Sequence, residues 1–492
     1  MEIKKFSFKK RSEMDLTSGN LFLKFGLFAL PLALTTMLQL LYTTIDLWTV
    51  STYGGGSLSM SAVGSNTALI NLIVTVFVNM SMGANVALSN AKGANDKVSA
   101  GKVLHTSILV ALFSGILVGL VGLLVSKYLL VLMGTPDSII DNASLYLKIY
   151  FCGLPFLMIY NYGAQMLRAL GDSTVPLVVL IISGIFNVAL DIILVKYACL
   201  DVMGVAIATV TSELVGAILI LLYLGFNKKG FVKFSFKNLR IDSESLKNVV
   251  KIGLPAGIQG LAFCIPNVLI QSSLYTITNY SINGVAISMD EIVTGSSAAS
   301  QIENYAFAIE EAIGVSICSF IGQNYGAKKK ENLRKLLGYA FIYNLITAVL
   351  FDAIVFTFSN QLLGVFINDT QGVIRENALA AGKERLMIML IPYILDGIMV
   401  TCGNYLRGMK ISTPPAIITL IGCTGFRILF LLTLFKTSYF HTIFWLYAAY
   451  PISWLIIDLA YIPILLILEK KGFKRLDLEI EKEKELSQNK EN

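Results

Sequence analysis

Long apolar runs separated by short polar segments fill most of the chain. A helix that crosses a membrane needs about 20 mostly apolar residues. Twelve stretches meet this requirement, at 22–50, 62–89, 102–126, 140–166, 174–198, 202–226, 251–276, 297–322, 334–358, 378–405, 413–436 and 442–468. The first run is too long for a secretory signal peptide and no small-residue cleavage site follows it, so we expect it to be retained. The pattern predicts an all-α integral membrane protein with twelve transmembrane helices.

Basic residues indicate how the chain is threaded through the membrane. Cytoplasmic loops of membrane proteins are enriched in Lys and Arg. If the N-terminus is cytoplasmic, most of the 39 Lys and Arg residues fall in inner segments. The outer loops then hold only Lys127, Lys148, Lys196, Arg375, Lys383, Arg385 and Lys436. We therefore expect a multi-pass protein of the plasma membrane with both termini in the cytoplasm.

Composition excludes several functional classes. With 55% hydrophobic and 14% charged residues, the chain is too apolar for a soluble enzyme, and its net charge of +7 belongs to the loops rather than to a nucleic-acid-binding patch. The only histidines are His105 and His441, and neither an HExxH nor a GxxxxGK(S/T) motif occurs. The six cysteines form no CxxC pair, which indicates free thiols. We expect no enzyme activity, no cofactor and no nucleic-acid partner.

Short motifs recur in the same order in the two halves of the chain. They are Leu-Pro at 30–31 and 254–255, Gly-Ala at 93–94 and 326–327, and Leu-Arg followed by Ser-Thr-x-Pro at 167–176 and 406–415. This order predicts a duplicated six-helix bundle. Because six is even, both copies start in the cytoplasm, and a pseudo-two-fold axis along the membrane normal relates them. The predicted units are an N-lobe at 1–226, a cytoplasmic linker at 227–250, a C-lobe at 251–468 and a charged cytoplasmic tail at 469–492.

Four polar side chains inside the apolar runs form a candidate cation site. Asp46 lies in the first run, Asn187 and Asp191 share one helix face in the fifth, and Thr209 lies in the sixth. Charged side chains within a membrane are costly and are therefore functional candidates. Oxygen ligands of this kind suit a small cation, and two carboxylates that share a site suit reversible proton uptake. A structural hydrogen-bond network between helices is the alternative.

Other charged residues in the runs give weaker signals. Asp396 in the tenth run has no acidic counterpart in the first half of the chain. Glu310 and Glu311 are adjacent on one helix, so they face different directions and do not form one site by themselves. The residues that we interpret as structural pairs or as lying near span ends are Arg427, Asp352 and Asp458.

The ordered set of motifs resembles the multidrug and toxic compound extrusion (MATE) family of cation-coupled antiporters, over nearly the whole chain. The matching motifs are LPL…LQLLY…D ending at Asp46, LRALGDSTVP after the fourth run, N-x-x-x-D at Asn187 and Asp191, GVAIAT leading to Thr209, GLPAGIQ in the seventh run and GQNYGA after the eighth. The resemblance implies two six-helix lobes around a V-shaped cavity. The same fold group includes lipid and oligosaccharide flippases.

Residue roles also follow from this resemblance. The family's N-lobe cation site, which holds a proton or sodium, matches Asp46, Asn187, Asp191 and Thr209. The acid that the NorM-type branch carries in span ten matches Asp396, a candidate C-lobe substrate or ion site. Phe263 stands where that branch has a span-seven glutamate, so the chain looks closer to the DinF-type branch. The segment at 280–291 departs from the family pattern.

The leading hypothesis is efflux of organic cations or amphipathic drugs in exchange for inward protons or sodium, by a monomer whose two lobes rock. The alternative within the fold group is a flippase for a lipid-linked precursor or oligosaccharide. A flippase would need a basic cavity to hold pyrophosphate, and only Arg427 lies within a span. A membrane enzyme or receptor would need a nucleophile–base set or an extra domain, and the sequence has neither.

Overall fold

A computed structural model describes residues 13–491 apart from 228–229, 278–280, 283–284 and 368–372. Within these residues, twelve helical segments are long and apolar enough to cross a membrane, and each coincides with one predicted run. The first seven helices are α1 (Leu21–Tyr53), α2 (Ser57–Gly93), α3 (Lys97–Leu132), α4 (Asp137–Ala169), α5 (Thr174–Asp191), α6 (Asp201–Phe226) and α7 (Ser243–Leu274). The others are α8 (Met289–Gly326), α9 (Lys330–Thr357), α10 (Ser359–Phe366), α11 (Val373–Leu390), α12 (Ile394–Gly408), α13 (Thr413–Thr419), α14 (Phe426–Leu432) and α15 (Ile443–Glu491).

Several helices extend beyond the apolar runs because polar residues cap them. The Asp96 carboxylate accepts hydrogen bonds from the first backbone N–H groups of α3, at Val98 and Ser99. Ser288 and Glu291 form a reciprocal capping box at the start of α8. Asp242 caps α7, so the last residues of the predicted linker at 227–250 are helical. The predicted division into lobes, linker and tail otherwise stays a prediction.

Asp242 caps α7 in its ionised form. The Ser245 backbone N–H donates to it at 3.0 Å, and the Lys102 ammonium lies 3.2 Å away. Together with the Ser245 hydroxyl, these donors lower the pKa of Asp242 to about 2. The cap is therefore fully charged at neutral pH, and its negative charge stabilises the N-terminus of α7.

Three of the spans contain irregular turns. A π-helix, η1 (Ile192–Tyr197), continues α5, and another, η4 (Leu420–Gly425), joins α13 to α14. The tenth span is divided between α11 and α12 by a 3₁₀ turn, η3 (Ile391–Tyr393). Its Pro392 has no backbone N–H for the helical ladder, which explains the break just before Asp396.

The segment that departs from the family pattern contains the one strand pair among the described residues. Strands β1 (Ser281–Ile282) and β2 (Val285–Ala286) pair antiparallel, with Ser281 opposite Ala286. Tyr280, at the start of the predicted segment, lies outside the described residues. The sequence predicted no strands, but a hairpin of this size between α7 and α8 leaves the class all-α.

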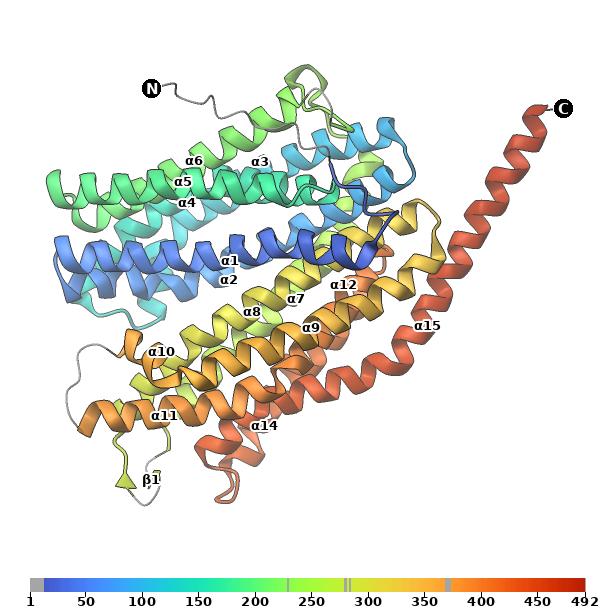
Figure 1. The fold of residues 1–492 in the computed structure, drawn as a ribbon. Coiled ribbons are helices and arrows are strands. Elements are labelled where there is room, and N and C mark those ends of the chain that lie inside the picture. The colour runs from blue at the N-terminus through green and yellow to red at the C-terminus, as the bar shows by residue number, and fades with distance from the viewer. Residues whose placement is uncertain (1–12, 228–229, 278–280, 283–284, 368–372, 492) are drawn as a thin grey trace, which may run out of the picture.

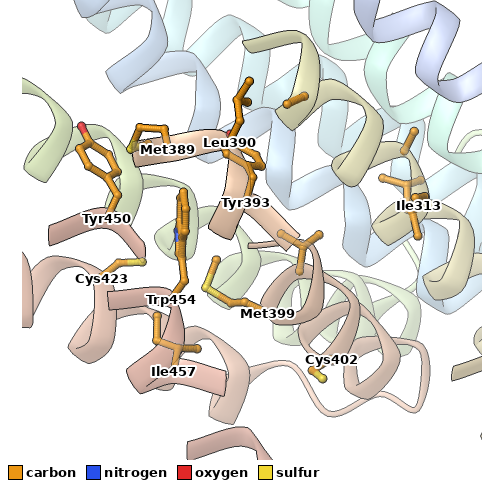
Figure 2. Close-up of a cluster of buried hydrophobic side chains, with 14 of the residues drawn as sticks. Ile313, Met389, Leu390, Tyr393, Met399, Cys402, Cys423, Tyr450, Trp454 and Ile457 are labelled. Carbon is orange, nitrogen blue, oxygen red and sulfur yellow. The ribbon is translucent and has the colours of Figure 1, made fainter. Parts of the chain in front are cut away.

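Two hydrophobic cores underlie the two lobes (Figure 1). One lies among α2–α6, and the other lies among α8–α15. The second contains an aromatic and sulfur-rich cluster around Tyr393, Tyr450 and Trp454 (Figure 2). The tail helix α15 runs on beyond the body of the molecule.

The first helix of each half crosses over to the other half. Phe25 and Phe28, in the first part of α1, belong to the C-lobe core, whereas Val50 near its end belongs to the N-lobe core. In the equivalent way, α7 of the second half packs against α2 of the first half. The two backbones are so close that the β-carbon of an alanine at Gly253 would lie 2.3 Å from the Met80 carbonyl oxygen. This exchange of α1 and α7 between lobes is what a two-fold relation between the halves requires.

Backbone geometry repeats at the motif positions. The turn after α2 places Asn95 at a φ of 56°, and the turn after α8 places Lys328 at a φ of 60°. The turn after α4 places Gly171 at 79°, and the turn after α12 places Lys410 at 63°. Positive φ is uncommon in residues other than glycine, so its occurrence at matched positions supports duplication. We call the end of the molecule that carries these four turns the basic end.

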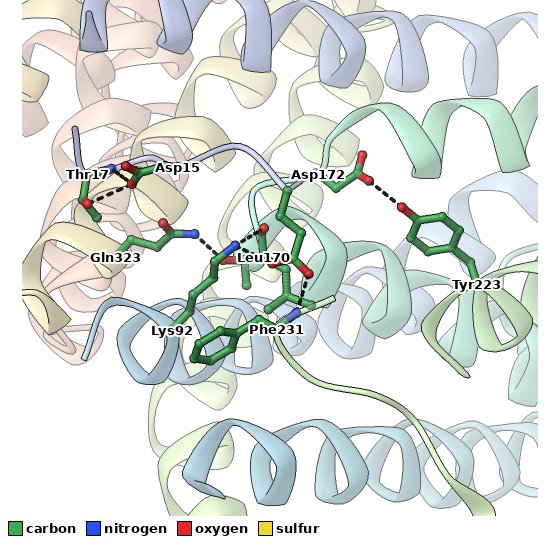
Figure 3. Close-up of polar contacts among 10 residues, drawn as sticks. Asp15, Thr17, Lys92, Leu170, Asp172, Tyr223, Phe231 and Gln323 are labelled. Atoms are coloured by element: carbon green, nitrogen blue, oxygen red, sulfur yellow. Dashed lines mark hydrogen bonds and ion pairs between the residues drawn. The ribbon is translucent and has the colours of Figure 1, made fainter. Parts of the chain in front are cut away.

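Two hydrogen bonds at matched positions join the lobes at the basic end. The Gln323 side-chain amide on α8 donates to the Ala169 carbonyl at the end of α4, at 2.7 Å. In the mirror arrangement, Asn90 on α2 donates to the Gly408 carbonyl at the end of α12, at 3.1 Å. Figure 3 shows Gln323 beside Lys92, which binds the Leu170 carbonyl. The lobes are therefore closed against each other at this end.

Candidate cation-coupling site

The structure brings together the four residues that the sequence selects for the N-lobe. Asp46 of α1 contacts the side chains of Asp191 and Asn187 on α5, and Thr209 Oγ1 of α6 lies 3.4 Å from Asp46 Oδ2. Asn187 and Asp191 are one turn apart on the buried face of α5, as their spacing predicts. Three helices thus position one cluster, although its role as a coupling site stays a proposal.

The carboxylates in this cluster have too few hydrogen-bond donors. The Thr209 hydroxyl has a single hydrogen, and the Val205 carbonyl at 2.9 Å is a closer acceptor than Asp46. Asp46 Oδ1 and both oxygens of Asp191 have no donor among the described residues. Asp191 is completely buried, and Asp46 is 9% exposed. Buried carboxylate oxygens without donors are costly, and a shared proton or a bound cation would satisfy them.

A cavity of about 470 Å³ opens onto this cluster. Asp46, Asn187 and Thr209 lie on its wall, while Asp191 lies behind them. Its other walls come from α2, α4 and the remainder of α1, α5 and α6, and they carry tyrosines, threonines and aliphatic side chains. No lysine, arginine or histidine is among the lining residues of this cavity. Its size is that of a site for a drug-sized molecule, and its fixed charges are negative.

Glu213 is a second acid on the wall of the cavity, beside Asp46, and the sequence interpretation missed it. It follows Thr209 by about one turn of α6, so both side chains face the cavity. Its Oε2 has no hydrogen-bond partner among the described residues. The signal was present, since a glutamate within the apolar run 202–226 meets the same criterion that selected Asp46.

The C-lobe contains a second pair of buried acids. Asp396, at the start of α12, contacts Glu310 of α8, and the two side chains are 2% and 5% exposed. Asn344 of α9 lies beside them and donates to Thr401 Oγ1 at 2.8 Å. The sequence treated Glu310 only together with Glu311. Its partner is on another helix, which helical periodicity within one run does not reveal.

Arg427 is buried within the C-lobe and is not among the residues that line the N-lobe cavity. It is 1% exposed, donates to Ser453 at 2.9 Å and stacks over the Tyr450 ring. Within the described residues, no ion pair joins it to either acid of its predicted group, Asp352 and Asp458. Arg427 therefore forms no structural ion pair with Asp352 or Asp458 among the described residues.

Arg385 does not belong to an outer loop, which corrects the charge assignment made from the sequence. It is 6% exposed on α11, and its guanidinium forms a two-pronged ion pair with Glu303 of α8, with both contacts at 2.7 Å. Its Nη1 also donates to Ser296. Removing Arg385 from the outer loops strengthens the charge asymmetry, because fewer basic residues then remain outside.

Comparison with known proteins places both halves of the chain in one family. The MatE family model matches residues 31–193 and 264–433. A probable multidrug resistance protein, YoeA of Bacillus subtilis, is 24% identical over 409 residues, covering 82% of this chain and 84% of the relative. The probable multidrug resistance protein NorM of Thermotoga maritima is 26% identical over 399 residues, covering 80% of this chain and 81% of the relative.

Solved structures agree with this fold. An outward-facing multidrug resistance MATE family transporter of the MOP superfamily superposes with a TM-score of 0.78 at 20% identity, covering 94% of this chain and 97% of that one. A MATE crystal structure in the straight conformation gives a TM-score of 0.78 at 21% identity, covering 94% of this chain and 98% of that one. The fold prediction of twelve helices in two six-helix lobes is confirmed. The assignment to the DinF-type branch stays a prediction.

Proposed function

The chain belongs to the MatE family of transporters, and from this premise we propose that it exports amphipathic or cationic small molecules across the plasma membrane in exchange for entering protons or sodium ions. One observation carries the proposal. The donor-poor pair Asp46–Asp191 lies at the wall of a drug-sized cavity whose lining has no basic side chain. An entering cation has a binding site there, and so does a cationic substrate.

The carboxylate oxygens of the pair take part in binding either ion. A proton taken up between Asp46 and Asp191 supplies the missing donor, and needs only the carboxylates. A sodium ion also needs neutral oxygens, which Asn187 and Thr209 offer. One cation entering at 100 mV gains about 2.3 kcal/mol, and a tenfold gradient adds about 1.4 kcal/mol. That sum sustains a several-hundredfold gradient of a neutral substrate in one-to-one exchange.

The contacts between the lobes favour a rocking mechanism. The lobes meet at the basic end through the matched contacts of Asn90 and Gln323, and basic loops are cytoplasmic in membrane proteins. The structure then corresponds to a state closed to the cytoplasm. Opening requires these two hydrogen bonds, and the contact of Asn85 with Ser319 deeper between α2 and α8, to break while each lobe keeps its own core. We propose that a single chain performs this cycle, with both termini in the cytoplasm.

The C-lobe pair is a second proposed ion site. Asp396 Oδ2 and Glu310 Oε2 have no donor among the described residues, and neither does Asn344 Oδ1. A proton shared between the two acids would satisfy them in the same way as in the N-lobe. A flippase for anionic lipid precursors is disfavoured, because the N-lobe cavity has an acidic lining and Arg427 is buried away from it.

The test is transport in proteoliposomes. We expect accumulation of ethidium to be driven by a proton gradient, and sodium to compete at the same site. Asp191→Asn should abolish gradient-driven transport without loss of insertion, since removing a buried charge does not oppose insertion. The matched control is Asp141→Asn, which neutralises an exposed acid paired with Lys127. Full transport by Asp191→Asn would move the coupling site elsewhere, with Asp396 as the next candidate.

A further inference from the structure

Glu213 is poorly explained as a structural acid. Its Oε2 is buried without a hydrogen-bond partner, and no ion pair compensates it among the described residues. An unpaired acid inside a membrane is costly and is retained only where it has a use. The coupling cluster is complete without it, since the side chains of Asp191, Asn187 and Thr209 already surround Asp46.

The surroundings of Glu213 suit an organic cation. Tyr146 and Tyr150 lie one turn apart on α4 and both line the cavity next to it. Their rings are nearly parallel, with centroids 6.3 Å apart. Aromatic faces attract cations, and more strongly where water is excluded. A carboxylate beside two aromatic rings is a combination that binds a desolvated ammonium or phosphonium group.

Close helix packing fixes the Glu213 carboxylate at this place. Gly153, one turn beyond Tyr150 on α4, lets α6 approach so closely that an added β-carbon would lie 2.9 Å from Glu213 Oε2. The same β-carbon would lie 2.7 Å from a methyl group of Val210. The carboxylate is thus held against α4, on the side of the cavity where Tyr146 and Tyr150 lie.

We propose that Glu213, Tyr146 and Tyr150 form a subsite that binds the positively charged group of the transported substrate. It adjoins the Asp46–Asp191 pair that binds the coupling ion, in the same cavity. This inference rests on the proposed export function and names the group that holds the substrate's charge. Glu213 and Asp46 are close enough for their charges to interact. A coupling ion bound at Asp46 therefore weakens the field that holds the substrate cation, and the substrate leaves.

The experiment measures ligand binding by purified protein, so it is independent of transport. Tetraphenylphosphonium and tetraphenylborate have the same shape and opposite charge. We expect Glu213→Gln to weaken tetraphenylphosphonium binding about tenfold or more and to narrow the preference over tetraphenylborate. Asp141→Asn should bind as the wild type does. Asp191→Asn should weaken binding less than Glu213→Gln does, because it removes only part of the more distant charge. Tenfold is about 1.4 kcal/mol.

The aromatic part of the subsite has its own comparison. Tyr150→Phe keeps the ring and should bind tetraphenylphosphonium within about twofold of wild type, whereas Tyr150→Leu should lose about fivefold. If Glu213→Gln does not fold, Glu213→Asp takes its place, because withdrawing the carboxylate from the rings should still weaken binding several-fold. Wild-type affinity in the folded Glu213 variant overturns the inference. Wild-type binding without gradient-driven transport would instead refute the proposed function and leave the subsite standing.

Discussion

Replacing Gly93 by alanine should open the basic end of the protein. Gly93 lies at the end of α2, where an added β-carbon would be 2.0 Å from the Gln323 carbonyl oxygen on α8. Carbon and oxygen atoms in ordinary contact are about 3.5 Å apart, and the clashing atom is backbone, so α2 and α8 must separate by more than about 1 Å. The better helix propensity of alanine acts in the open and closed states alike and does not offset the clash.

The size of the effect follows from the two matched hydrogen bonds that join the lobes nearest to the clash. Separation stretches the 2.7 Å contact of Gln323 with Ala169 and the 3.1 Å contact of Asn90 with Gly408. Each such hydrogen bond contributes about 1 kcal/mol. Losing both shifts the equilibrium by about 2 kcal/mol toward the open state, which is roughly a thirtyfold change in the ratio of the two states.

Distances between spin labels at the exposed residues Lys97 and Glu331, in a cysteine-free background, report this equilibrium. These positions lie in the first turns of α3 and α9 at the basic end, one in each half of the chain. Gly93→Ala should move much of the distribution to longer distances. Gly101→Ala is the matched control, since an added β-carbon there has no atom within 4 Å. An unchanged distribution in Gly93→Ala, or an equal shift in Gly101→Ala, would refute the reasoning.

Three further outcomes are expected. A cysteine beside Lys330 should react with an impermeant reagent only from the cytoplasmic side and one beside Asp290 only from outside; the reverse pattern in intact cells would contradict the threading. Asn187→Ala should reduce the effect of sodium on transport more than proton-driven transport, because a proton needs only the carboxylates; equal losses would count against a shared site. Glu303→Gln should lower the free energy of unfolding by about 3–5 kcal/mol, because it leaves the buried Arg385 guanidinium without its partner; a melting temperature equal to wild type would contradict that role.

The bilayer explains why the fold was predictable from the sequence. Its thickness sets the length of each apolar run, so all twelve spans could be located, and duplication was visible in matched motifs. The helix ends were less accessible, because Asp96 and Ser288 extend α3 and α8 by polar capping that a hydropathy pattern does not register. The break before Asp396 occurs at Pro392. The apolar run continues on both sides of this proline, so the hydropathy pattern gives no sign of the break.

The candidate site was predicted where one helix or a known motif carried the signal. Asn187 and Asp191 share a helix face, so their spacing was enough. Glu310 and Asp396 were not recognised as a pair, because α8 and α12 are distant in sequence and only packing brings them together. Glu213 was missed although it stands alone in an apolar run, since its meaning depends on the tyrosines of α4 that line the cavity beside it.

Counterflow of the coupling ion tests the central claim most directly. Proteoliposomes with no imposed ion gradient receive a gradient of ethidium, and a pH-sensitive dye or radioactive sodium reports the ion that moves in the opposite direction. For the wild type, we expect ion movement in proportion to the ethidium transported. For Asp191→Asn, we expect none, while Asp141→Asn should match the wild type. Opposed ion movement that persists in Asp191→Asn would contradict the assignment of the coupling ion to the Asp46–Asp191 pair.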